Sequence, residues 1–170
     1  LDKYLIDGAG GKRLAYLGQS LRALDASLAH SLHVVVGDQI EVLKDLMKRY
    51  NADSVHISAE YEPYGAARDL RVEAAGIALV RTGSPYAVAP GRVVKPSDAT
   101  PYKVYTPFYR AWSLHGWRKP VATPKNIKCV MPNENDRNFP DWPLPDGVSI
   151  TAAGELAALE RWKYFQENGL

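Results

Sequence analysis

The chain has 170 residues, of which 46% are hydrophobic and 24% are charged, and its formal net charge is +2 at pH 7. This composition excludes a disordered, fibrous or collagen-like protein, and the small charge does not indicate nucleic-acid binding by this chain alone. No apolar stretch approaches the roughly 20 residues of a membrane span, and the N-terminal residues lack a signal-peptide pattern. With Cys129 as the single cysteine, we expect a cytoplasmic protein that does not bind membranes.

Helix and strand patterns alternate from the start of the chain. Leucines at steps of three and four predict an amphipathic helix over residues 11–30. The apolar, β-branched run Leu32–Val36 predicts a buried strand. Asp38 is expected to cap the next helix, which runs to about Tyr50.

A further strand–helix–strand unit follows. Strands are predicted over Ser54–Ser58 and Ile77–Arg81, with a helix between them that ends near Ala75, and Gly76 is expected in the left-handed conformation after that helix. The strands recur about every 22–24 residues, which is typical of right-handed crossovers in a parallel sheet. The predicted fold is therefore a Rossmann-like α/β domain whose parallel sheet is flanked by helices.

The second half of the chain is mostly irregular in its sequence pattern. Glycines and prolines predict an irregular excursion over residues 82–106, followed by a short helix over 107–117 that Pro107 could open. Residues 118–150 have the composition of a linker. Helical periodicity returns in 151–170, so we expect residues 1–117 to form the α/β domain and 151–170 to begin a separate helical domain.

The glycine-rich segment Gly8–Arg13 lacks the details of a phosphate-binding loop. Arg13 stands where such a loop needs Ser or Thr, so a flexible entry to the helix is the favoured interpretation. A cation is unfavourable in the first helical turn, and the Arg13 side chain either points into solvent or serves a ligand. The spacing of the four histidines is not typical of a metal site, and Cys129 lies in the linker, so we predict neither a metal site nor catalytic residues.

The loop after the second predicted strand is the candidate binding site. Ligands bind at the carboxyl ends of parallel strands in open α/β sheets. Two carboxylates, two tyrosine rings and a glycine could form a wall for a planar heterocycle. The same residues could equally form a turn whose tyrosines pack on the sheet edge. The candidate residues are Glu60, Tyr61, Glu62, Tyr64 and Gly65.

Two motifs resemble the N-terminal α/β domain of DNA photolyases and cryptochromes. They are Glu62–Asp69, with the sequence EPYGAARD, and Tyr102–Phe108, with the sequence YKVYTPF. Weaker similarities occur in family order at Arg13–Leu17, Arg81–Tyr86 and Ala153–Leu159. The resemblance thus extends along essentially the whole chain.

The resemblance implies a light-harvesting function. In this family an α/β domain carries an antenna chromophore, and a following helical domain binds FAD and a flipped-out cyclobutane pyrimidine dimer of damaged DNA. The parent protein would then be a deoxyribodipyrimidine photolyase, a carbon–carbon lyase, whose FAD domain starts within residues 151–170. A cryptochrome-type blue-light photoreceptor, and a nucleotide-binding α/β module without photochemistry, are the alternatives.

The loop sequence favours a deazaflavin-type antenna, with folate or FMN as the alternatives. Folate-binding members carry Asn-Glu where this chain has Tyr64-Gly65. The resemblance implies that an arginine and two acidic residues line the pocket, that the glycine permits close approach, and that a tyrosine stacks on the ring. The corresponding residues are Arg13, Glu60, Tyr61, Glu62, Tyr64 and Gly65.

One family feature has no counterpart in this sequence. The α/β domain of the family opens with two strands, the first of which bears an aromatic-Arg-Asp-Leu-Arg run, and neither strand is found here. We therefore expect a sheet that is truncated at its N-terminal side and that leaves unpaired strand edges.

Overall fold

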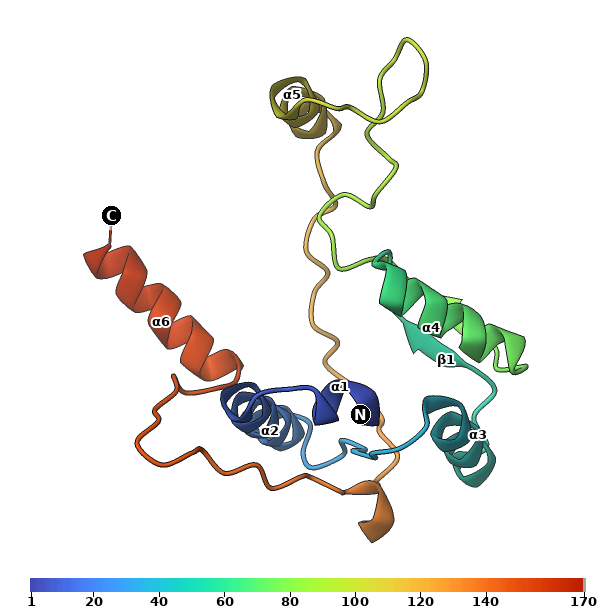
Figure 1. The fold of residues 1–170 in the computed structure, drawn as a ribbon, viewed down its shortest axis with the longest axis vertical. Coiled ribbons are helices and arrows are strands. Elements are labelled where there is room, and N and C mark those ends of the chain that lie inside the picture. The colour runs from blue at the N-terminus through green and yellow to red at the C-terminus, as the bar shows by residue number, and fades with distance from the viewer. Residues whose placement is uncertain (170) are drawn as a thin grey trace. The chain divides into compact units, whose positions relative to one another are not determined.

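The computed structural model describes residues 1–169, which form two compact units. The first unit joins Leu1–Val42 to the segment that starts at Ile127, and the second unit is Leu43–Asn126. Figure 1 colours the elements of both units by residue number. Within residues 1–169, no helix combines the length and the apolar character needed to cross a membrane.

The first unit is mainly helical. Its longest helix ends close to the predicted position and buries Ala15, Gly18 and Asp25. A Cβ on Gly18 would lie 3.4 Å from the Trp142 ring, so the absence of a side chain there lets the later segment pack closely on this helix. The elements of this unit are α1 (Lys3–Asp7), α2 (Gly11–Ser27), the 3₁₀ turn η1 (Glu134–Asp136) and α6 (Glu155–Asn168).

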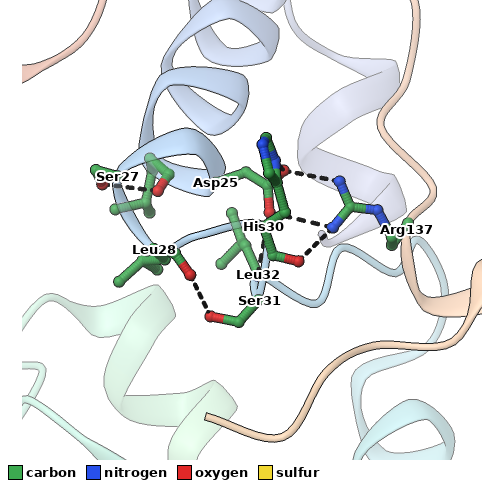
Figure 2. A network of polar contacts seen from close by, with 8 residues as sticks. Asp25, Ser27, Leu28, His30, Ser31, Leu32 and Arg137 are labelled. Atoms are coloured by element: carbon green, nitrogen blue, oxygen red, sulfur yellow. Dashed lines mark hydrogen bonds and ion pairs between the residues drawn. The ribbon is translucent and has the colours of Figure 1, made fainter. Parts of the chain in front are cut away.

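A buried carboxylate joins distant segments of the first unit (Figure 2). Asp25, on α2, is 4% exposed and accepts hydrogen bonds from Nδ1 of His30 at 2.9 Å and from Nη2 of Arg137 at 2.8 Å. The backbone N–H of Leu32 donates to the same carboxylate at 3.1 Å. A charged group is tolerated in this buried position because each of these donors satisfies it.

Helix α3 (Gln39–Tyr50) begins as the sequence predicts. The Oδ1 atom of Asp38 accepts hydrogen bonds from the N–H groups of Ile40 at 3.0 Å and Glu41 at 3.1 Å. These contacts satisfy two of the N–H groups that a helix leaves free at its start.

The second unit contains a two-stranded parallel sheet. Strands β1 (Val55–Ile57) and β2 (Leu79–Arg81) are joined by helix α4 (Pro63–Ala74), and helix α5 (Tyr105–His115) follows later in the chain. Val72 and Ile77 are buried in the core of this unit. Gly76 has a φ of +81° after α4, as predicted. The expected α/β class, a parallel sheet flanked by helices, is confirmed.

Two sequence predictions need correction. Leu32–Val36 does not form a strand; only Val34 makes a bridge, with Arg137. The N–H of Val34 donates to the carbonyl of Asp136 at 2.6 Å, and its carbonyl accepts from the N–H of Asn138 at 2.9 Å. No strand among residues 1–169 is placed to extend this pairing, so it stays a single bridge. Helix α5 also begins at Tyr105, two residues before Pro107.

Candidate functional site

The loops that follow β1 and β2 lie side by side. The N–H of Thr82 donates to the carbonyl of Ile57 at 2.8 Å, and the N–H of Ala59 donates to the carbonyl of Gly83 at 3.1 Å. Because the two strands are parallel, both carboxyl ends lie at the same edge of the sheet. This is the edge at which open α/β sheets bind ligands.

A cavity of about 740 Å³ opens at this edge. Its volume falls within the range of about 300–1,000 Å³ that is usual for small-molecule sites. Residues after β1, residues after β2 and residues at the end of α5 contribute to its wall. The lining comprises Ala59, Tyr61, Arg81, Gly83, Ser84, Tyr86, Ala87, Val88, Ala89, Arg92, His115, Gly116, Trp117 and Arg118.

Aromatic rings form part of the cavity wall. The rings of Tyr61 and Tyr86 meet edge to face, with centroids 6.0 Å apart and planes at 74°. Trp117 stacks on Trp112, with centroids 4.9 Å apart. These contacts restrain the rings and leave apolar surfaces on which a planar ligand could stack.

A carboxylate holds the hydroxyl group of Tyr86. Its Oη donates to Oε1 of Glu62 at 3.2 Å. This hydrogen bond, together with burial, raises the pKa of Tyr86 above its usual value. The phenol is therefore a protonated donor throughout the neutral range.

The charged side chains of the cavity wall are all arginines. Arg81 forms an ion pair with Glu73, which lowers the pKa of that glutamate. Arg92 and Arg118 form no ion pair within residues 1–169. No aspartate or glutamate contributes to the wall, so the cavity has a positive character.

A second cavity shares the segment Tyr86–Ala89 with the first. It measures about 510 Å³, and its wall is apolar, with Phe108 and Trp112 among its residues. Phe108 ends the YKVYTPF motif. The second motif of the chain therefore lies beside the same loop as the sheet-edge cavity.

The residues of the predicted loop have different surroundings. Tyr61 lines the cavity, and Glu62 binds Tyr86. The carboxylate of Glu60 instead accepts hydrogen bonds from the N–H groups of Tyr61 at 2.9 Å and Glu62 at 3.2 Å. The side chain of Glu60 also occupies the space that a Cβ on Gly65 would need.

The two remaining candidates lie on helices. Tyr64 is exposed in the first turn of α4. Arg13 is exposed in the first turn of α2, within the first unit. The chromophore-binding roles assigned to all six residues stay predictions.

Several cavity residues were not identified from the sequence. The segment Gly83–Arg92 follows a parallel strand, so the rule that identified the first loop applies equally to it. The segment His115–Arg118 begins at the last residue of α5, and the sequence predicted its first three residues only as the end of the helix over 107–117. Only the folded chain brings it to the sheet edge.

Comparison with known proteins identifies the family. Residues 3–125 match the model of the DNA photolyase family. The chain therefore belongs to that family. A deoxyribodipyrimidine photo-lyase of Agrobacterium fabrum is 32% identical over 95% of this chain, and one of Synechococcus sp. is 28% identical over 93% of it. The crystal structure of a class III photolyase from Agrobacterium tumefaciens superimposes with a TM-score of 0.65, at 26% identity over 98% of this chain.

The chain spans only part of each of these relatives. It covers 37% of the Agrobacterium fabrum protein, 36% of the Synechococcus protein and 37% of the crystallised chain. An uncharacterized 31.6 kDa protein of Synechococcus is 31% identical over 93% of this chain. The chain covers 60% of that protein's length. The similarity is thus to one portion of a photolyase.

Proposed function

We propose that this chain is the antenna-chromophore domain of a DNA photolyase. The observation that supports the proposal is the sheet-edge cavity: Glu62 of the first family motif binds Tyr86 in its wall, and Tyr102 and Phe108 of the second motif line the adjoining cavity. The chain would hold a planar chromophore in this cavity, and its parent protein would act in the cytoplasm on cyclobutane pyrimidine dimers in DNA.

The cavity residues fit a planar chromophore. Tyr61, Tyr86 and Trp117 offer ring surfaces, and the Glu62–Tyr86 hydrogen bond fixes one of them. When bound, an antenna chromophore absorbs near-ultraviolet or blue light and transfers the excitation energy to FAD. The protein's task is to keep the ring in one orientation and to shield it from water.

A deazaflavin-type ring is the antenna that we propose within this class. Tyr64-Gly65 replaces the Asn-Glu of folate-binding members, which supports this choice over folate. Glu60 and Gly65 shape the loop through their mutual packing, and Arg13, which belongs to the first unit, is proposed from the family resemblance alone. FAD and damaged DNA would bind to a helical domain that begins within residues 151–170.

The action spectrum of dimer repair tests this function. In the protein that joins this chain to an FAD domain, we expect repair at the antenna absorption band and at the flavin band. Arg13→Ala and Glu62→Ala should lose the antenna band and keep repair under direct flavin excitation, because these residues hold only the antenna. Repair without any antenna contribution in the unmodified protein, or loss of flavin-driven repair in the variants, would contradict the proposal.

A further inference from the structure

The positive charge of the chain is concentrated around α5. From Ala99 to Asn126 the sequence has five lysines and arginines and no aspartate or glutamate, whereas the rest of the chain has 16 lysines and arginines and 19 acidic residues. The five cations are Lys103, Arg110, Arg118, Lys119 and Lys125. The segment thus carries a charge of +5 and the remainder −3, so the small net charge of the whole chain conceals one strongly basic stretch.

The five cations are accessible to an anionic partner. All of them are exposed, and none forms an ion pair within residues 1–169. Arg118 lies over the backbone of Gly83, where a Cβ would be 2.9 Å from its Nη1 atom. The guanidinium of Arg118 is therefore held beside the β2 loop, and the other four cations belong to α5 and its flanking segments.

A row of stacked aromatic rings lies along the same helix. Tyr105, Tyr109 and Trp112 occupy positions i, i+4 and i+7 and therefore share one face of α5. The centroids of Tyr105 and Tyr109 are 5.8 Å apart, those of Tyr109 and Trp112 are 6.2 Å apart, and each pair of planes meets at 20°. Tyr105 is 73% exposed and Tyr109 is 50% exposed. A helix ordinarily buries such a stripe in a core, whereas α5 presents both tyrosines to solvent.

Cations and rings are interleaved at this face. Lys103 stands two residues before Tyr105, and an arginine, Arg110, directly follows Tyr109. Proteins that bind single-stranded nucleic acid combine the same two elements, because cations neutralise the phosphates and the bases stack on aromatic side chains. An acidic peptide would pair with the cations but would bring no bases to the rings. The combination therefore favours a nucleic acid over an acidic protein.

We propose that Lys103, Tyr105, Tyr109 and Arg110, the α5 surface, bind single-stranded nucleic acid. The rings stack on bases and the cations contact phosphates. Every base has a flat face, so stacking requires neither a particular sequence nor a lesion. Tyr105, Tyr109 and Arg110 line neither of the two cavities described above. The inference therefore goes beyond the antenna function and does not depend on a bound chromophore.

Fluorescence anisotropy of labelled oligothymidylate with residues 1–170 tests the surface. An oligonucleotide of about 12 nucleotides lies within the usual site sizes of about 4–16. Tyr109→Ala should weaken binding at least about fivefold, because one stacking platform is lost, and Tyr109→Phe should retain binding, because the ring remains. Tyr164→Ala, at an exposed tyrosine of α6, is the matched control and should leave the affinity unchanged.

The salt dependence of the same titration tests the cations. Arg110→Gln should weaken binding and reduce the slope of log affinity against log salt by about 0.7, the contribution of one phosphate of a single strand. Arg161→Gln, at an exposed arginine of α6, should leave the slope unchanged. Equal effects of Tyr109→Ala and Tyr164→Ala, or equal slopes in all proteins, would overturn the proposal. Tighter binding of polyglutamate than of oligothymidylate would also overturn it, and would identify an acidic protein as the partner.

Hydroxyl-radical footprinting tests the surface in the protein that joins this chain to an FAD domain. Tyr105 and Tyr109 should be modified in the free protein and protected when oligothymidylate is added. Protection of both tyrosines before any oligonucleotide is added would show that the added domain occupies the surface, and would overturn the proposal. The chromophore band should be the same in Tyr109→Ala as in the unmodified chain, so failure of the antenna function and failure of this surface are observed separately.

Discussion

The Tyr86–Glu62 pair gives the most specific test at the level of single residues. The hydrogen bond to Glu62 raises the pKa of the Tyr86 phenol. In Glu62→Gln the negative charge is gone, so the pKa of Tyr86 should fall toward its ordinary value of 10.0. NMR titration of ring-labelled tyrosine would follow this group directly. An identical titration of Tyr86 in both proteins would contradict the contact.

The stacking surface of Trp117 can be tested by truncation. Trp117→Ala removes a ring from the cavity wall and should weaken chromophore binding about two- to twelvefold, since stacked aromatic contacts contribute about 0.5–1.5 kcal/mol. Trp162→Ala is the matched control, because Trp162 is an exposed residue of α6 that also stacks on a neighbouring ring, Phe165. Equal effects of the two substitutions on binding would argue against a specific role of Trp117.

The sequence predicted part of the candidate site residue by residue. It identified Tyr61 because the parallel-strand rule points to the loop after β1. It could not show that the side chain of Glu60 folds back onto its own loop, since that depends on the free space above Gly65. It also could not show Arg118 over Gly83, because these residues are far apart in sequence and no local pattern links them.

At the level of elements, the Asp25 network stabilises the first unit. Arg137→Ala removes two donors from a buried carboxylate and should lower the free energy of unfolding by about 2 kcal/mol. Lys3→Ala breaks an exposed ion pair between Lys3 and Asp7 within one helix and should cost less than about 0.5 kcal/mol. Urea denaturation measures both values. Equal effects of the two substitutions would show that the network contributes little.

The same network predicts a dependence on pH. Burial raises the pKa of Asp25, but the hydrogen bonds from His30, Arg137 and the Leu32 N–H outweigh it and hold the pKa below its ordinary value of 3.8. The stabilisation is therefore fully present above pH 3.8 and is lost as the pH falls through the lower value of the folded state. Unfolding free energies measured from about pH 6 down to pH 2 should decline less in Asp25→Asn than in the unmodified chain. Parallel declines would contradict this assignment.

Local patterns predicted most of the elements. Leucine spacing predicted α2, the Asp38 cap predicted the start of α3, and Gly76 predicted the end of α4. Strands β1 and β2 were predicted on either side of α4. Leu32–Val36 shows where such patterns fail. A run of β-branched residues favours an extended backbone, but a strand also needs a partner, and here Arg137 supplies only one bridge.

At the scale of the whole molecule, membership of the DNA photolyase family agrees with the α/β architecture. The cavity, both family motifs and the parallel sheet all belong to the second unit, Leu43–Asn126. Arg13 and the helix of residues 151–170 belong to the first unit. The division into an α/β domain of residues 1–117, a linker of 118–150 and a helical start remains a prediction.

The absorption spectrum of the loaded chain tests the central claim most directly. Residues 1–170 would be incubated separately with a deazaflavin, a reduced folate, FMN and adenine nucleotides, and then passed over a gel-filtration column. We predict that a chromophore co-elutes with the chain at about one per molecule and adds a near-ultraviolet or blue band. Tyr61→Ala should weaken that band. The light-harvesting function would be contradicted if an adenine nucleotide bound at the sheet edge and none of the chromophores co-eluted with the chain.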